Sequence, residues 1–449
     1  MQFLKNKLYF NSLILSTPGF VSILLSLVSI PIHLNILGID NYGNYIFFHI
    51  MLSFSFLLNF GISKSIIIAC GKFQNSKSEI AFEGLKYSFL VIILLIFFHL
   101  VNLHFNIINF KNFSSNVLLI GIILSIIYLV LEGILQSYKK FKAISLFNFL
   151  FYSLALSMPS IILIYFENLS LNNLISISIS IKFVVVLSIC LIMLKDKLVL
   201  KSKSKILSNI IKKNSLWLTL NSFLMQLYEM LDKYLIKIFF GNSALAIYSI
   251  PQQLTGKLSV LSRGFSAFLM PFLSAGSKKE DFNKTLDIFF CLVPIIIFSL
   301  FPLYSLILST WLGENYSEQI LSLTKIFSLI AILSSTSHIL ITNFEANQIS
   351  KINFKIEIFL LPIFLIFLIY LFLYHDSLVN ISLVVLSKEL ILNILRLFYL
   401  KKKIKNYKKY FINLILFNLI LFFSFQEISV YIILLFIFAK NENQFQIYS

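Results

Sequence analysis

Charged side chains are scarce in this sequence. They make up 12% of its 449 residues, while 58% of the residues are hydrophobic. Soluble domains have about 25% charged residues, so this chain has roughly half the usual share. Glycine and proline are also few, with 13 and 8 residues. This composition excludes a disordered chain, a secreted disulfide scaffold and a soluble enzyme, and it indicates a polytopic membrane protein.

Cysteine and arginine are rare as well. Cys70, Cys190 and Cys291 are far apart in apolar runs, so they predict neither a disulfide framework nor a metal cluster. Only Arg263 and Arg396 are arginine, so lysine supplies nearly all of the 37 basic residues, against 19 acidic ones. Because basic residues in such an apolar chain mark cytoplasmic loops, we expect no nucleic-acid partner.

Long apolar runs fill the sequence. A bilayer core of roughly 30 Å needs about 20 apolar residues per helix. The first run, Leu8 to about Leu37, is longer than a signal peptide requires, so we expect it to be a transmembrane helix. Two further runs, 411–425 and 428–439, are short but could form a tilted hairpin, which would raise the count from twelve to fourteen. The twelve predicted spans are 12–37, 45–70, 85–108, 115–137, 144–166, 171–194, 215–240, 244–274, 286–311, 319–344, 356–374 and 378–400.

The loops between these spans differ sharply in charge. Lysines gather in every second loop, whereas the alternate loops hold a single lysine, Lys111. The lysine-poor loops carry the acidic residues Asp40, Glu167, Glu314, Glu318, Asp376 and Glu427. By the positive-inside rule, the N- and C-termini are predicted to be cytoplasmic. The localisation that we expect is a bacterial inner membrane.

Two weak internal matches predict a duplication. Gly38 precedes Tyr45 by seven residues, and Gly241 precedes Tyr248 by seven, at an offset of 203. The segments 135–141 and 346–352 resemble each other at an offset of 211. We therefore expect a six-helix bundle in 1–200, a basic cytoplasmic linker in 201–214 and a second six-helix bundle in 215–400. Residues 401–449 would form a basic loop and the short hydrophobic hairpin. Parallel repeats of this kind are a recurrent transporter plan.

The predicted seventh span carries a polar stripe. Its members are Ser222, Gln226, Glu229, Lys233 and Lys237, and Asp232 lies at its edge. On a helix these positions share one face and extend over roughly 22 Å. Such a stripe cannot face lipid, so it lines either a water-filled cavity or a contact with another helix. Glu229 and Lys233 stand four residues apart, so pairing within the helix is the other interpretation of these two.

Other spans add polar candidates. Arg263 shares a face with Gln252 in the eighth span, and Arg suits a bidentate grip on phosphate or carboxylate. Lys64 lies beside a polar face of the second span. His33, in the first span, is the one histidine on a polar face, which makes it the candidate for protonation chemistry. Glu389 in the twelfth span can pair with Lys388 or Arg396, which favours a structural role.

No catalytic motif occurs in the sequence. Nucleotide-binding, serine-hydrolase and zinc-protease signatures are absent, and the histidines show no metal-ligand spacing. We therefore expect a protein that is not an enzyme, has no catalytic residue and holds neither cofactor nor metal.

Several short motifs resemble the polysaccharide transporter family of the multidrug/oligosaccharidyl-lipid/polysaccharide (MOP) exporters, that is, the O-antigen (Wzx-type) flippases. The stretch from Leu37-Gly38 through Tyr42-Gly43-Asn44-Tyr45, preceded by Pro31, is similar to the family's exit from the first span. The other motifs are Asn59-Phe60-Gly61-Ile62, Leu231-Asp232-Lys233-Tyr234 with Gly241 and Tyr248, Pro271-Phe272-Leu273, and Trp311 through Tyr316.

This resemblance implies a MATE-like, V-shaped pair of six-helix bundles around a cationic central cavity. It implies a flippase that moves undecaprenyl-diphosphate bearing an oligosaccharide from the cytoplasmic to the periplasmic leaflet by alternating access. The candidates for binding the substrate are Lys233, Lys237, Arg263, Gln226, Gln252 and Lys64, and the candidates for charge pairing or coupling are Glu229, Asp232 and His33. The implied partners are the lipid-linked oligosaccharide, membrane lipids, and the polymerase and chain-length machinery of the same pathway.

Three alternatives remain open at this stage. A MATE-type drug or cation antiporter would place unpaired carboxylates in its lumen, whereas lysine outnumbers acid on the seventh-span stripe. An O-antigen polymerase would need a large periplasmic loop, and no predicted outer loop exceeds about a dozen residues. A lipid II flippase would also carry a lipid diphosphate. Neither the glycan nor the coupling ion can be named from the sequence.

Overall fold

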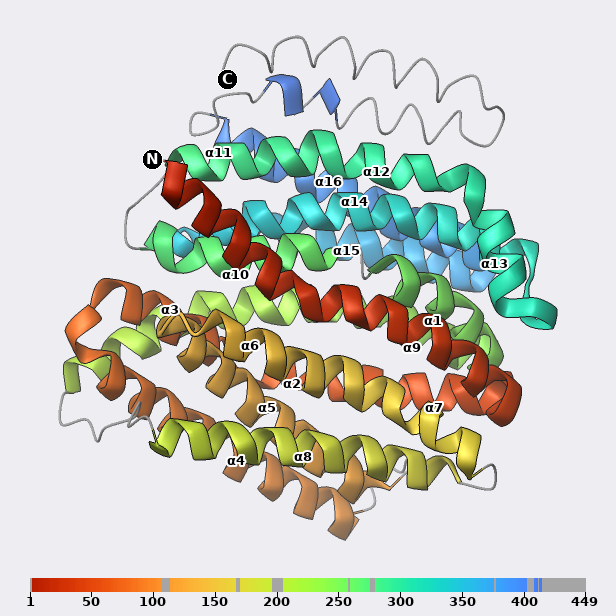
Figure 1. Ribbon diagram of the computed structural model, residues 1–449, viewed down its shortest axis with the longest axis horizontal. Helices are drawn as coiled ribbons and strands as arrows, with labels where there is room; N and C mark the ends of the chain where they lie inside the picture. The colour runs from red at the N-terminus through yellow and green to blue at the C-terminus, as the bar shows by residue number, and fades with distance from the viewer. Residues whose placement is uncertain are drawn as a thin grey trace.

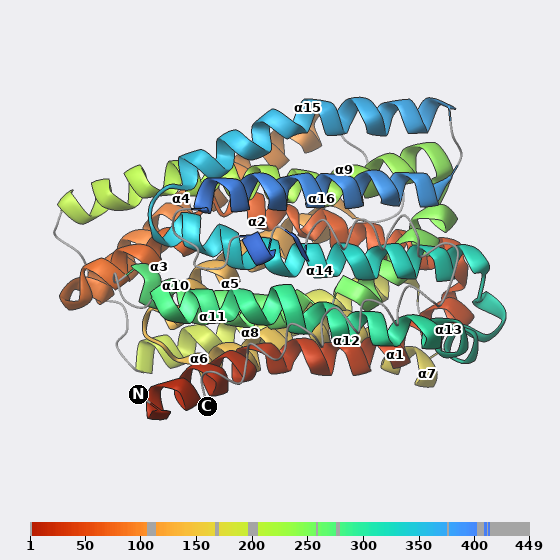
Figure 2. The same cartoon turned by 90° about the horizontal axis from the view of Figure 1, so that it is seen from above.

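The computed structural model describes residues 2–105, 114–166, 170–195, 205–256, 259–274, 279–374, 377–401, 408–410 and 412–413. Within these ranges the chain is helical apart from short turns, and it contains no strand. The long helices run side by side along one direction (Figures 1 and 2). The predicted all-α membrane architecture is therefore confirmed. The predicted hairpin at 411–425 and 428–439 lies almost wholly outside the described residues.

The described residues of the first half form the helices α1 (Gln2–Leu52), α2 (Phe54–Leu58), α3 (Ile62–Lys72), α4 (Lys77–Phe105), α5 (Ser115–Ser137), α6 (Phe141–Asn148), α7 (Ala155–Tyr165) and α8 (Leu171–Lys195). The second half adds α9 (Lys205–Gly256), α10 (Val260–Ser274), α11 (Lys279–Asp287), α12 (Val293–Leu300), α13 (Tyr304–Leu312), α14 (Glu318–Ala346), α15 (Ser350–Tyr374) and α16 (Leu378–Leu400). Short 3-10 or π turns join several of them, including η2 (Phe149–Leu154) between α6 and α7. Because α9 begins at Lys205, most of the predicted linker 201–214 is helical.

Nine helical segments of the described chain are long and apolar enough to cross a membrane. One of them, Ile14–Leu58, has 45 residues, which is about twice the length that a bilayer requires. The helix α9, which holds the predicted seventh span, is not among the nine. The count of twelve spans therefore stays a prediction.

Both of the longest helices bend at a glycine. α1 contains Gly38 with φ 76° and ψ 162°, and α9 contains Gly241 with φ 84° and ψ −172°. Only glycine adopts this backbone region readily, because a Cβ would clash. After each glycine the chain turns back towards the end from which it came (Figure 1). The two glycines that were paired in the sequence thus make the same kind of reversal.

The second pair of matched segments also shares a backbone conformation. In the turn after α5, Lys139 has φ 57°, and in the turn after α14, Gln348 has φ 59°. Each turn is closed by equivalent hydrogen bonds, from Lys140 N–H to Leu135 C=O (3.0 Å) and from Ile349 N–H to Phe344 C=O (2.9 Å). The structural offset is 209, so the offset of 211 taken from the sequence is two residues too long.

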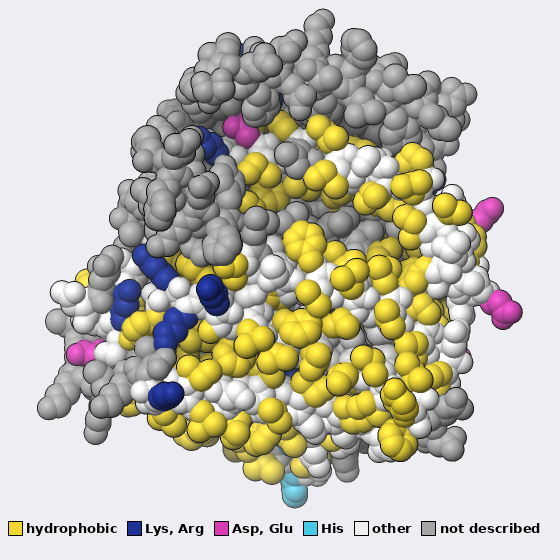
Figure 3. All heavy atoms as spheres, in the orientation of Figure 1, with side chains coloured by type: hydrophobic (Ala, Val, Ile, Leu, Met, Phe, Trp, Pro, Cys, Tyr) yellow, Lys and Arg dark blue, Asp and Glu magenta, His cyan; other side chains and the backbone are white. Residues whose placement is uncertain are grey.

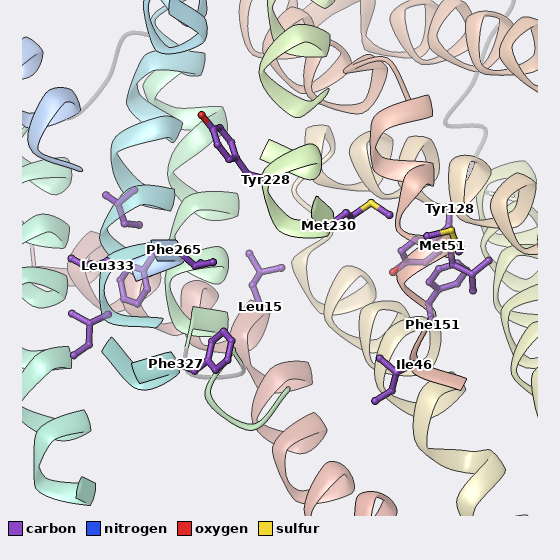
Figure 4. Packing of buried hydrophobic residues seen from close by; sticks show 14 of the residues in the cluster. Leu15, Ile46, Met51, Tyr128, Phe151, Tyr228, Met230, Phe265, Phe327 and Leu333 are labelled. Atoms are coloured by element: carbon purple, nitrogen blue, oxygen red, sulfur yellow. The ribbon is translucent and has the colours of Figure 1, made fainter. Parts of the chain in front are cut away.

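The two ends of the molecule differ in charge. On the face shown in Figure 3, Lys and Arg side chains gather at the left end, where α1 begins, and acidic side chains project from the right end. Most buried apolar side chains of the described residues form one large cluster, in which Tyr128 and Phe151 lie near Met51, away from Tyr228 and Phe265 (Figure 4). The cytoplasmic placement of the termini remains a prediction with which this charge distribution agrees.

Candidate functional site between the two halves

The polar stripe on α9 faces the first half of the chain. Gln226 is 7% exposed, and its amide donates to Ser53 Oγ at 2.8 Å. Lys237 places its ammonium 3.3 Å from the centre of the Phe47 ring, which is a close cation–π contact. Of the two interpretations of the stripe, these contacts favour a helix contact at both of its ends. Gln252, further along α9, is half-buried.

The acidic members of this stripe have partners other than those expected. Asp232 is buried, and it accepts hydrogen bonds from the Tyr248 hydroxyl (2.7 Å) and from the Lys233 main-chain N–H (2.8 Å). The ammonium of Lys233 donates to the main-chain carbonyl of Glu229. The carboxylate of Glu229 is itself exposed. Asp232 therefore joins the two arms of the bent α9 instead of neutralising a lysine.

Two cations lie on helices where the halves meet, and a third lies within the second half. The Lys64 ammonium, on α3, lies 2.5 Å from Glu345 on α14, and that carboxylate is 3% exposed. Arg263, on α10, is exposed, and its guanidinium lies 3.4 Å from Ser259 Oγ. Arg396 lines a cavity together with His338. Sequence reasoning found Lys64 and Arg263 but missed both Glu345 and His338.

A buried ion pair anchors the third of these cations. Arg396 on α16 lies 2.5 Å from Glu357 on α15, and both side chains are at most 2% exposed. Asn353 accepts from Arg396 Nε and donates to Glu357, each at 2.8 Å. Next to this pair, Lys388 binds Glu389 at 2.8 Å, one of the two partners predicted for that carboxylate. The spacing of Asn353 and Glu357, four residues apart, was the available sequence signal for this network.

A cavity opens beside this network. It has a volume of about 50 Å³ and lies wholly within the second half of the chain. Its lining includes three acidic and two basic side chains together with His338. The lining residues are Met225, Tyr228, Glu229, Ser334, Ser337, His338, Ile341, Glu357, Lys388, Glu389, Leu392 and Arg396. This cavity is thus of mixed charge, and Glu229, one of the candidates for charge pairing, is among its lining residues.

The first half of the chain offers a different chemistry. Asn148 donates to Glu132 at 2.9 Å and accepts from the Tyr128 hydroxyl at 2.6 Å. The Tyr128 ring stacks on Phe151 with centroids 3.9 Å apart, and Tyr152 stands edge-on to it. Sequence reasoning missed this cluster, since its members are spread over α5, α6 and η2 and form no stripe.

His33 lies apart from the cations. It is 2% exposed, its Nδ1 is 3.3 Å from Ser160 Oγ, and its ring packs against Tyr42 and Tyr45. All of these residues belong to the first half of the chain. The structure therefore does not bring His33 together with the other predicted site residues.

The two halves touch at both ends of the molecule. At one end, Ser243 Oγ donates to Asp40 at 2.5 Å, and Gly43 packs against the main chain of Asn242. At the other end, Gly61 lies so close to α9 that a Cβ would approach Thr219 N to 2.8 Å. Ile67, Ile68, Leu218 and Met270 form a small apolar cluster of α3, α9 and α10 in the same region. The two halves are therefore in contact on both sides of the α9 stripe.

Comparison with known proteins places the chain in a family. A family model described as "Polysaccharide biosynthesis protein" matches residues 8–277. A Shigella flexneri protein named "Putative O-antigen transporter" is 30% identical over 106 residues, which are 22% of this chain and 25% of that protein. The alignment thus spans about a quarter of the relative's length.

Solved structures share the fold. "Crystal structure of MATE in complex with MaL6" has a TM-score of 0.68 at 16% identity and covers 89% of this chain and 97% of that one. An outward-facing MATE family transporter of the MOP superfamily has a TM-score of 0.67 at 15% identity, covering 89% and 96%. A MOP superfamily transporter from Pyrococcus furiosus, whose binding pocket is described as having reverse polarity, has a TM-score of 0.65 at 14% identity, covering 89% and 96%.

The family model covers more than half of the chain, and the helical architecture agrees with it. The resemblance found in the sequence is thereby confirmed: the chain belongs to the Polysaccharide biosynthesis protein family and has the fold of the MATE transporters of the MOP superfamily.

Proposed function

We propose that this protein is a flippase for an undecaprenyl-diphosphate-linked oligosaccharide, the repeat unit of an O-antigen. It moves this lipid from the cytoplasmic to the periplasmic leaflet of a bacterial inner membrane. The observation that carries the proposal is the ion pair between Lys64 in the first half and Glu345 in the second, which places a partly exposed cation where the two halves meet. A second exposed cation, Arg263, lies on α10, which packs against α1 and α3 of the first half. The family and the name of the Shigella flexneri relative support the same class of cargo.

A cluster of cations inside a membrane protein needs a reason, because each charge is costly to bury there. A lipid diphosphate supplies one, since its headgroup must leave bulk water while it crosses. Arg263 is exposed and offers a planar guanidinium that can hold two phosphate oxygens at once. Arg396 is already satisfied by Glu357, so it contributes long-range potential instead of a direct contact.

Lys64 has a partner that the substrate can replace. Its ion pair with Glu345 links α3 to α14 near the end where α3, α9 and α10 pack together. A diphosphate entering at this end competes with the Glu345 carboxylate for the Lys64 ammonium. The ion pair then keeps this end closed while the protein is empty and gives way when substrate arrives.

Alternating access follows from the two sets of contacts between the halves. In the proposed cycle, the two six-helix bundles, 1–200 and 215–400, separate first at the Gly61–Thr219 end and then at the Asp40–Ser243 end. The polar stripe of Gln226, Lys233 and Lys237 travels with α9 and is uncovered as Phe47 and Ser53 withdraw. Only one end is open at a time, so ions do not leak with the lipid.

The test is a leaflet-resolved measurement in a host that lacks this gene. We expect single lipid-linked repeat units to accumulate on the cytoplasmic face and the wild-type gene to relieve the accumulation. An Arg263→Glu copy should transport at least about thirtyfold less, because it puts a negative charge where the phosphate must bind. Lys284→Glu, a charge reversal at an exposed residue of α11, is the matched control and should behave as wild type.

Other outcomes would contradict the proposal. Single units already on the periplasmic face would indicate a polymerase defect. No accumulation at all would favour a drug or cation antiporter. Normal transport by Arg263→Glu would show that Arg263 does not bind the phosphate during transport.

A further inference from the structure

We propose that the protein holds the sugar next to the diphosphate in a subsite of the first half, formed by Phe56, Tyr152, Glu132 and Asn148. The two aromatic rings provide a stacking face, and the carboxylate and amide provide a hydrogen-bonding edge. This inference rests on the proposed function and adds to it the chemical class of ligand that these residues recognise, a neutral pyranose ring.

The stacking face is open. Phe56 is 41% exposed and Tyr152 is 38% exposed, and their rings are nearly parallel, with 14° between the planes and centroids 6.3 Å apart. The apolar C–H face of a sugar packs well on such rings, because an aromatic side chain brings a large rigid area at little cost in side-chain entropy. The two residues come from different elements, α2 and η2, so their ring contact joins two helices.

The ring of Tyr152 is held in place by two buried aromatic rings. Phe151 packs on Tyr128 at 3.9 Å with 9° between the rings, and both stand edge-on to Tyr152, at 5.1 Å and 5.5 Å. Tyr128 and Phe151 are buried and lie together in the core (Figure 4). The recognition ring is therefore preorganised, which lowers the entropic cost of binding.

The hydrogen-bonding edge has the chemistry of hydroxyl recognition. Asn148 binds one oxygen of Glu132, at 2.9 Å, and is itself oriented by the Tyr128 hydroxyl. An ionised carboxylate has about four acceptor sites, so Glu132 retains capacity for sugar hydroxyls. Glu132 is half-buried, and an acidic group inside a membrane protein is expensive unless it has a ligand or partner.

Charge at this subsite selects against the other ligand classes. Glu132 repels phosphate, so the diphosphate itself does not bind here. A cationic drug is disfavoured in turn, because the Lys182 ammonium lies 5.0 Å from the Phe151 ring. Gln136, one turn after Glu132 on α5, donates at 2.5 Å to the main-chain carbonyl of Ala267, one turn after Arg263 on α10. This contact puts the sugar subsite beside the proposed phosphate site, as a sugar joined directly to a diphosphate requires.

The test compares lipids with and without a sugar. Purified full-length protein in nanodiscs is titrated with undecaprenyl diphosphate and with undecaprenyl diphosphate carrying one hexose or one N-acetylhexosamine. We expect wild type to bind a sugar-bearing lipid more tightly than the bare one. Glu132→Gln should weaken binding of that lipid about ten- to hundredfold, the range for losing a hydrogen bond to a charged group. Tyr152→Ala should weaken it about tenfold, because it removes a stacking ring. Tyr152→Ala should bind the bare lipid within twofold of wild type, and Glu132→Gln should bind it at least as tightly as wild type.

Retained binding of the bare lipid also shows that each variant is folded. Tyr165→Ala removes a tyrosine that is 78% exposed at the end of α7, outside the subsite, and should leave both affinities unchanged. Equal binding of all lipids by wild type, or equal losses for both lipids in Tyr152→Ala and Glu132→Gln, would overturn the sugar subsite and leave the flippase intact. Failure of wild type to bind any lipid diphosphate would overturn the proposed function itself.

Discussion

At the scale of single residues, the molecule separates two uses of buried charge. The pair formed by Arg396 and Glu357 is almost fully buried, and Asn353 and Ser337 also bind it, which is typical of a structural anchor. The pair formed by Lys64 and Glu345 is open on one side, since the lysine is 32% exposed. Removing one partner of an enclosed pair destabilises the fold, whereas a residue of an open pair can exchange its partner for a ligand. The two pairs therefore predict different phenotypes.

Breaking the enclosed pair should destabilise the protein. Glu357→Ala leaves the Arg396 guanidinium buried without its counter-charge, which costs about 3–5 kcal/mol. The check is the thermal midpoint of the detergent-purified variant, which should fall clearly below that of wild type. Glu357→Leu combined with Arg396→Met should recover much of the loss, because no isolated charge remains. An unchanged midpoint for Glu357→Ala would contradict the structural role.

Breaking the open pair should change binding in opposite directions. Glu345→Gln frees Lys64 for phosphate and should lower the Kd for bare undecaprenyl diphosphate about tenfold. Lys64→Gln removes the cation and should raise this Kd about tenfold, the worth of one charge-assisted contact. Titration of the two variants in nanodiscs checks both values. A pair with only a structural role would weaken binding in both variants.

At the scale of elements, the two reversals at Gly38 and Gly241 decide how α1 and α9 are built. Both glycines were marked in the sequence by their spacing to a tyrosine, and both adopt a backbone that other residues avoid. Nothing lies within 4 Å of a Cβ at either position, so glycine is required there by the positive φ of the backbone and not by close packing. The equivalent turns at Lys139 and Gln348 add to this pattern and support the proposal of a duplicated chain.

Substitution of either glycine should therefore cost a similar amount. Gly38→Ala and Gly241→Ala force a Cβ into a disfavoured conformation, at about 1–3 kcal/mol each. Their thermal midpoints should drop by comparable amounts. Gly256→Ala is the control, because that glycine lies in a helix, also has open space around it and has no positive φ. If the thermal midpoint of Gly256→Ala fell as far as those of Gly38→Ala and Gly241→Ala, backbone strain would not be the cause of the lower stability.

The polar contacts between elements were harder to predict than the elements themselves. Periodicity located the α9 stripe, since its residues recur at helical spacing. It could not show that Gln226 binds Ser53 or that Lys237 packs on Phe47, because those partners are more than 170 positions away. Glu345 follows the predicted span 319–344 and Glu357 is the second residue of the predicted span 356–374, so both stood at span ends beside a lysine-containing turn. The packing of α14, α15 and α16 buries them. Local pattern predicts which face is polar, and tertiary packing decides its partner.

At the scale of the whole molecule, the two halves are in contact at both ends, so transport by alternating access requires each contact to break in turn. If each end must separate once per cycle, a covalent link at either end stops transport. At one end, a Cβ on Gly71 would lie 3.5 Å from Ser274 Cβ, within the range of a disulfide. At the other end, the side chains of Asp40 and Ser243 touch at 2.5 Å. Cysteine pairs at 71 and 274, or at 40 and 243, would thus lock one end each.

We expect each locked pair, in a background with Cys70, Cys190 and Cys291 replaced by Ala, to lose transport on oxidation and regain it on reduction. The measurement is the leaflet distribution of lipid-linked repeat units in proteoliposomes before and after a reducing agent. A third pair, Thr17→Cys with Ser145→Cys, links α1 to α6 within the first half, where the two hydroxyls lie 2.8 Å apart. It should oxidise without loss of transport, because a rigid half does not have to open. Continued transport with either end locked would mean that the lipid passes a fixed path along the protein, so the two halves would not need to move against each other.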